Sequence, residues 1–133
     1  MKRGVEHLVP LSVQSIARLA ELREITGSSK LLFPNGRRPD DCMTATTINR
    51  ALERMGLSGA GTLGFSAHGF RGTASTLLHE QGYLSAAIER QLAHAEGNKT
   101  LAAYNKAEYL KERIQMMQDW ANQIDKLRPS PVG

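Results

Sequence analysis

Apolar residues recur at intervals of three and four over most of this chain, which is the spacing of one face of an α-helix. Ser12 and Ser66 can each cap a helix that follows, and Phe65 and Phe70 occupy the two positions of a hydrophobic staple. The pattern predicts helices between Ser12 and Gly27, over residues 44–55, between Ser66 and Gly82, over residues 85–92, around Tyr104 and over residues 108–127.

Each long predicted helix has an apolar stripe that should face a core. The expected core positions are Ile16, Leu19, Ala20 and Leu22, then Ile48, Ala51, Leu52 and Met55, then Ala74, Leu77 and Leu78, and finally Leu110, Ile114, Met117, Ala121 and Ile124.

The two ends of the chain have a different pattern. Residues 5–11 contain the run Leu8-Val9-Pro10, which predicts a short strand, one half of a hairpin, with the proline at its edge. Residues 128–133 contain two prolines and predict a flexible tail. We therefore expect a mainly α fold with a small β element near the N-terminus.

Composition limits the class of protein. A chain of 133 residues is large enough for one domain with its own core, and the net charge of +4 favours a polyanionic partner. The only cysteine, Cys42, excludes an internal disulfide and fits a reducing compartment. No apolar run is long enough to span a bilayer, so we expect a cytoplasmic protein that does not bind membranes.

His68 and Arg71 are the first candidates for chemistry. They are three residues apart at the start of a predicted helix, so both side chains project from one face near backbone N–H groups that favour an anion. An arginine can hold two phosphate oxygens at once, and a histidine can transfer protons near neutral pH. On their own, the two residues also fit a solvated arginine and a capping histidine.

His94 follows the predicted helix over 85–92 and could equally be a partner for the helix dipole. The four histidines and Cys42 lack the spacing of metal ligands, so no metal site is expected.

One of the three tyrosines stands out as a possible nucleophile. Tyr83 follows a helix end and Tyr109 begins the last helix, so both are expected to be structural, the first with a solvated hydroxyl. Tyr104 lies among small residues, and its phenol would need a nearby positive charge or base to react. Lys2 has no distinguishing feature by composition alone.

Several segments, in order and spacing, resemble the tyrosine recombinase (phage integrase) family, specifically the prophage-type integrases. They cover nearly the whole chain, and their joint order is more specific than any one of them. The matching segments are residues 7–12 (HLVPLS), 66–75 (SAHGFRGTAS), 88–94 (IERQLAH), 98–99 (NK), 102–110 (AAYNKAEYL) and 116–121 (MMQDWA).

The resemblance implies a role for each candidate residue. Tyr104 matches the nucleophile, which would attack a DNA phosphate to form a 3′-phosphotyrosyl link and release a 5′-hydroxyl. Arg71 matches the second of two family arginines that hold the phosphate, and His68 and His94 match positions assigned to proton transfer or phosphate contact. Lys2 matches, more weakly, a hairpin lysine that protonates the leaving oxygen. No metal, other cofactor or small-molecule substrate is implied.

The resemblance also implies what this sequence lacks. The family's first arginine and its preceding DNA-binding domains have no counterpart, so residues 1–127 are expected to be part of an integrase catalytic domain that is weakly active or inactive alone. In the family the partner is double-stranded DNA, bound by a tetrameric synapse, and the last helix can contact a neighbouring protomer. The alternatives are a DNA-binding module or recombination regulator without chemistry, and a protein-interaction domain that uses Met116 and Met117.

Overall fold

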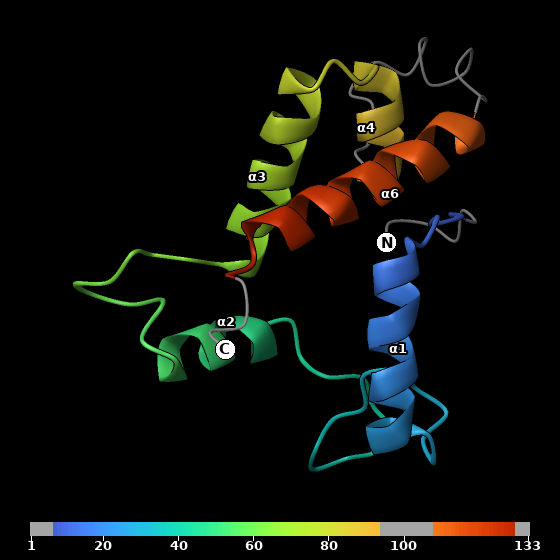
Figure 1. Ribbon diagram of the computed structural model, residues 1–133. Helices are drawn as coiled ribbons and strands as arrows, with labels where there is room; N and C mark the ends of the chain where they lie inside the picture. The colour runs from blue at the N-terminus through green and yellow to red at the C-terminus, as the bar shows by residue number, and fades with distance from the viewer. Residues whose placement is uncertain (1–6, 94–107, 130–133) are drawn as a thin grey trace, which may run out of the picture. The chain divides into compact units, whose positions relative to one another are not determined.

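The computed structural model describes residues 7–93 and 108–129, and these residues are mainly helical (Figure 1). The mainly α class predicted from the sequence is therefore confirmed. Among the described residues, no helix is long and apolar enough to cross a membrane. The helices are α1 (Val13–Thr26), α2 (Thr47–Arg54), α3 (Ala67–Glu80), α4 (Ser85–Gln91) and α6 (Leu110–Leu127).

The chain divides into two compact units. One is formed by Met1–Ser15 together with Ala74–Gly133, and the other by Ile16–Thr73. The first unit contains α4 and α6, and the second contains α2 and the first turns of α3.

Two serines begin helices, as the sequence predicts. The Ser12 hydroxyl accepts a hydrogen bond from the backbone N–H of Ser15 at 3.1 Å, at the start of α1. The Ser66 hydroxyl accepts one from the N–H of Gly69 at 2.9 Å, at the start of α3. Each bond satisfies a donor that the first helical turn leaves without an intrahelical acceptor.

The predicted β element is not observed where the structure can be compared with it. Residues 7–11 form no strand, and the first two residues of the predicted strand lie outside the described part of the chain. Pro10 has no N–H to give to a ladder, and the carbonyl of Leu8 instead accepts a hydrogen bond from the Arg113 guanidinium. Within residues 7–93 and 108–129, β pairing is confined to one isolated bridge between Pro34 and Cys42.

The core of the first unit joins three helices through one apolar residue from each. Leu78 of α3, Ile88 of α4 and Met116 of α6 are at most 2% exposed. Partly buried apolar side chains surround this cluster, and α4 contacts α6 directly. These surrounding residues are Tyr83, Leu92, Met117 and Trp120.

The predicted stripes of α1, α2 and α6 are wrong in part. In the stripe of α2, Leu52 is buried, but Ile48 is 49% exposed and Met55, directly after the helix, is 69% exposed. No residue of α1 is buried, and Ile16 is 55% exposed. In α6, Ile114 is 54% exposed, whereas the buried residues are Arg113, Met116 and Ala121. The buried face is thus rotated by about one residue: Met116 packs in the core, and the Arg113 guanidinium on the same face has acceptors inside the unit.

Candidate active site

The start of α3 is held by contacts from its own unit. The side-chain oxygen of Asn49, on α2, accepts a hydrogen bond from the N–H of Ala67 at 2.9 Å. The rings of Phe65 and Phe70 stack with centroids 5.9 Å apart, which confirms the predicted staple. Together with the Ser66 cap, these contacts fix the direction in which the first turn of α3 points.

The first two turns of α3 carry His68 and Arg71, two of the five candidate site residues. Both lie in α3, as predicted, and His68 is exposed whereas Arg71 is half-buried. Residues three apart on a helix project from the same face, and the partial positive charge of a helix N-terminus lies beside them. The first turns of α3 therefore present an imidazole and a guanidinium where an anion is favoured.

The other three candidates, Lys2, His94 and Tyr104, lie outside the described residues. The structure does describe both flanks of the segment that carries His94 and Tyr104. These flanks are the end of α4 and the residues immediately before α6. They belong to one unit, and they are joined by a polar network.

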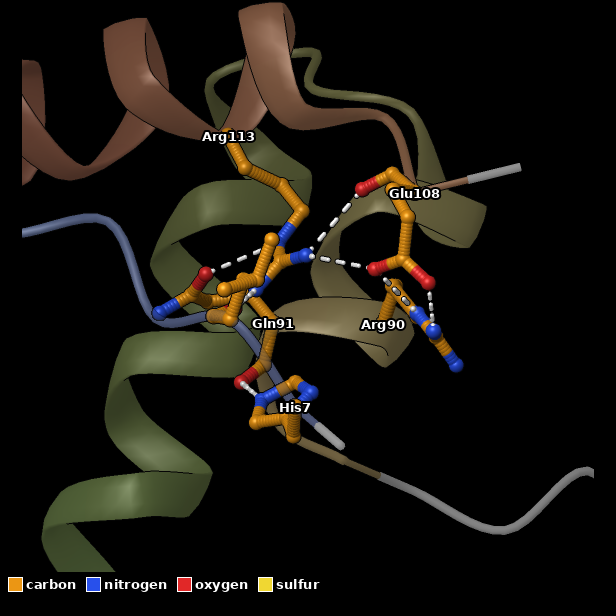
Figure 2. Close-up of polar contacts among 6 residues, drawn as sticks. His7, Arg90, Gln91, Glu108 and Arg113 are labelled. Atoms are coloured by element: carbon orange, nitrogen blue, oxygen red, sulfur yellow. Dashed lines mark hydrogen bonds and ion pairs between the residues drawn. The ribbon is translucent and has the colours of Figure 1, made fainter. Parts of the chain in front are cut away.

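Arg113 of α6 is the centre of that network (Figure 2). Its side chain is fully buried, and its Nε donates to Gln91 Oε1 at 2.9 Å. Its Nη1 donates to the Glu108 carbonyl oxygen at 3.1 Å and lies 3.5 Å from Glu108 Oε2, while Nη2 donates to the carbonyl of Leu8. One guanidinium therefore connects the N-terminal segment, the end of α4 and the residue two positions before α6.

Two further contacts tighten the same connection. Arg90 forms a two-pronged ion pair with Glu108, with Nε donating to Oε2 at 3.1 Å and Nη2 donating to Oε1. Nε2 of His7 lies 3.3 Å from the carbonyl oxygen of Gln91 (Figure 2). A planar guanidinium that meets both oxygens of a carboxylate fixes orientation as well as distance.

The environment of this network shifts the pKa values of Glu108 and Arg113. The hydrogen bond from Arg90 lowers the pKa of Glu108, and the positive charges of Arg90, Arg113 and His7 lower it further. Desolvation by burial lowers the pKa of Arg113, and the Glu108 carboxylate opposes that shift. Glu108 is thus held ionised between two arginines.

Replacing Glu108 with glutamine should reduce stability at neutral pH more than at acidic pH. The lowered pKa means that the ionised carboxylate stabilises the fold above the ordinary carboxyl pKa, and that this contribution is lost as the pH falls through the folded-state value. We expect the Tm of Glu108→Gln to be below that of wild type at about pH 7, and the gap to narrow toward about pH 3. A Tm gap that stays constant over this range would contradict the assignment.

The described tyrosines differ in environment. The Tyr83 hydroxyl donates to Asp119, and burial together with this carboxylate raises the pKa of Tyr83 to about 12. The predicted packing role of Tyr83 is confirmed, but its hydroxyl has a protein partner and is not simply solvated. A phenol whose proton is held in this way is a poor nucleophile. Tyr109 precedes α6 in a left-handed backbone conformation.

Sequence reasoning missed Arg113, Glu108 and Arg90. Charged residues are rarely fully buried, so an arginine inside an amphipathic helix is expected to face solvent. The one available signal was that Arg113 is three residues before Met116 and therefore shares a face with an apolar residue. Among residues 7–93 and 108–129, no group of His, Cys, Asp and Glu could hold a metal ion.

Comparison with known proteins places these residues in a family. Residues 1–111 match the model of the phage integrase family. The chain is 43% identical over 127 residues to the integrase of Enterobacteria phage P4, covering 94% of this chain and 28% of that protein. It is 39% identical over 124 residues to prophage integrase IntA of Escherichia coli (strain K12), covering 93% of this chain and 29% of that protein.

A third relative, prophage integrase IntZ of Escherichia coli (strain K12), is 42% identical over 128 residues, covering 96% of this chain and 30% of that protein. The chain thus spans less than a third of the length of these relatives. No solved structure matches the chain. The family match covers well over half of the chain, and the chain belongs to the phage integrase family.

Proposed function

We propose that this chain supplies the nucleophile and phosphate-binding groups of a tyrosine-type site-specific DNA recombinase. The observation that carries the proposal is that a chain of the phage integrase family has His68 and Arg71 on the capped first turns of α3. Tyr104 follows them in sequence, with the order and spacing of the tyrosine recombinases.

The proposed reaction is an exchange of one phosphodiester for another. The Tyr104 oxygen attacks a DNA phosphorus, a 3′-phosphotyrosyl bond forms, and the bond to the 5′-oxygen breaks. The proton lost by the phenol passes to a base, and Lys2 gives a proton to the leaving 5′-oxygen. Because the bond energy is kept in the phosphotyrosine, a 5′-hydroxyl of another strand can reverse the step and reseal DNA without a metal or nucleotide.

Arg71 and the histidines stabilise the charge that develops at phosphorus. The guanidinium can donate two parallel hydrogen bonds to non-bridging oxygens, and His68, on the same face of α3, adds a third polar group. His94 completes this set. Such donors are most effective when they are in position before the reaction.

Double-stranded DNA is the proposed partner. The unit Ile16–Thr73 has eight Lys and Arg residues against five Asp and Glu, so it contributes most of the net positive charge of the chain. Contacts between lysines or arginines and phosphates give affinity that is independent of sequence and falls with added salt. We further propose that the recombining protein assembles as a tetramer on two DNA sites, with α6 as a contact between protomers.

The test is covalent capture on a nicked duplex that loses the short strand carrying the 5′-hydroxyl, so that resealing is prevented. The full-length gene product, incubated with this duplex and EDTA, should give an adduct that survives SDS. The 133-residue chain assayed alone should give much less adduct, because no residue in it matches the family's first arginine. No adduct with the full-length product would contradict the proposal.

A second candidate function is a DNA-binding regulator of recombination that lacks chemistry. The observation that favours it is the excess of Lys and Arg over Asp and Glu in the unit Ile16–Thr73, which would bind DNA without any chemistry. Such a protein would retain the duplex in a gel shift and give no SDS-resistant adduct under any condition. The capture experiment therefore separates the two functions.

A further inference from the structure

We propose that Arg113 is a positioning residue for strand cleavage: it holds both flanks of the segment 94–107 and thereby aims Tyr104 at the phosphate. This inference rests on the proposed function, since it assigns a role in presenting that nucleophile. Arg113 is not among the residues proposed to contact DNA.

The contacts of Arg113 lie on both flanks of the segment 94–107. Its Nε holds Gln91, the last residue of α4, and its Nη1 holds Glu108 through both the carbonyl oxygen and the carboxylate. Gln91 and Glu108 lie on opposite sides of the segment that carries His94 and Tyr104. A single side chain thus fixes the distance between the two points where that segment leaves and rejoins the described fold.

The backbone is strained at the same two flanks. Among the described residues, the non-glycine residues with positive φ are Ala93, at +50°, and Tyr109, at +46°. Residues with a Cβ adopt this conformation at a cost and keep it only where their surroundings enforce it. Ala93 follows α4 and Tyr109 precedes α6, so both flanks turn sharply beside the residues that Arg113 holds.

An arginine that is fully buried at this position needs a role other than packing. Packing alone would be served by an apolar residue such as Met116, one turn further along the same face of α6. A buried ion pair is weak evidence for stability, because desolvation offsets the attraction, and its best-attested benefit is to specify one arrangement. Arg90 of α4 forms an ion pair with Glu108 and so stabilises the same single arrangement.

The test separates aiming of the nucleophile from DNA binding and from folding. In the full-length gene product, the single-turnover rate of adduct formation at saturating nicked duplex, the Kd for DNA and the Tm are measured for Arg113→Met. We expect the adduct rate to fall by about tenfold to a hundredfold, as for a nucleophile displaced by an ångström, with Kd within about threefold of wild type. Arg128→Met is the matched control, because Arg128 is exposed and forms an ion pair with nearby Asp125 among the described residues, and it should match wild type.

A second substrate distinguishes the nucleophile from the leaving group. In a duplex with sulfur in place of the bridging 5′-oxygen, the thiolate leaves without needing a proton. A defect in the general acid would be rescued by this duplex, whereas a defect in aiming Tyr104 should persist. Rescue of Arg113→Met would overturn the proposal.

If Arg113→Met does not fold, Arg90→Met decides the question. Arg90 is partly exposed and holds only the Glu108 side of the network, so its variant should fold and should lower the adduct rate by a few-fold without changing Kd. A rate equal to wild type would overturn the proposal. So would a loss in rate explained by the unfolded fraction alone.

The failure of this inference differs from failure of the proposed function. If wild type forms no adduct through Tyr104, the proposed function fails and the positioning role fails with it. If wild type forms the adduct and Arg113→Met forms it at the same rate, only the positioning role is wrong.

Discussion

Replacing Tyr104 with phenylalanine should abolish covalent attachment to DNA and leave the noncovalent complex intact. The substitution removes one oxygen and keeps the aromatic ring. Without a nucleophile the fall in rate should be on the order of 10⁶, the size seen when an enzyme loses its nucleophilic oxygen. The measurement is the fraction of nicked duplex in an SDS-resistant adduct with the full-length gene product, alongside a gel-shift Kd.

Tyr83→Phe is the matched control for this prediction. It makes the same chemical change at a residue whose hydroxyl donates to Asp119 and whose pKa is raised to about 12. We expect adduct formation at the wild-type rate and a lower Tm. Persistence of the adduct in Tyr104→Phe, or its loss in Tyr83→Phe, would show that the nucleophile is assigned wrongly.

Replacing Arg71 with alanine should slow adduct formation by about 10² to 10³, the usual cost of removing one donor that stabilises transition-state charge. Arg71→Lys should recover part of this loss, because lysine keeps the charge but cannot give two parallel hydrogen bonds to one phosphate. The rate is measured at saturating duplex, so that a change in affinity does not enter it.

The control for Arg71 is Arg18→Ala on α1. Arg18 is exposed and pairs with Glu21 one turn away, so its loss should leave the rate at saturating duplex unchanged. Equal effects of Arg71→Ala and Arg18→Ala would mean that Arg71 contributes only general positive charge.

The described helices, and the starts of α1 and α3, could be predicted from the sequence because their signals are local. Ser12 and Ser66 cap as expected, and the Phe65–Phe70 staple forms, since each depends on residues a few positions apart. The strand expected over residues 5–11 could not be predicted from the local sequence alone, because a strand forms only where a second strand pairs with it. In the described part, Leu8 bonds to Arg113, far along the chain.

The buried face of α6 was mispredicted for a similar reason. Apolar periodicity placed Ile114 inward, but the buried face includes Arg113, whose burial depends on acceptors from Leu8, Gln91 and Glu108. No local pattern reports such acceptors, since they are brought together only by the fold. Apolar periodicity therefore predicts the wrong buried face where a charged residue lies among the buried positions of a helix.

The candidate site, too, could be predicted from the sequence only in part. The identities of His68 and Arg71 and their place on α3 followed from sequence order, and the structure agrees about the helix. Lys2, His94 and Tyr104 are outside the part of the chain that the structure describes, so their roles stay predictions. The network around Arg113 was found only from the structure.

The most direct test of the central claim is to identify the residue that carries the DNA. The three tyrosines fall in three different tryptic peptides: residues 72–90 contain Tyr83, residues 100–106 contain Tyr104 and residues 107–111 contain Tyr109. The adduct from the nicked duplex is digested with nuclease and trypsin, and the peptide bearing the nucleotide is identified by mass spectrometry. We predict that the nucleotide is on the peptide of residues 100–106, at Tyr104; a nucleotide on either of the other two peptides would contradict the account.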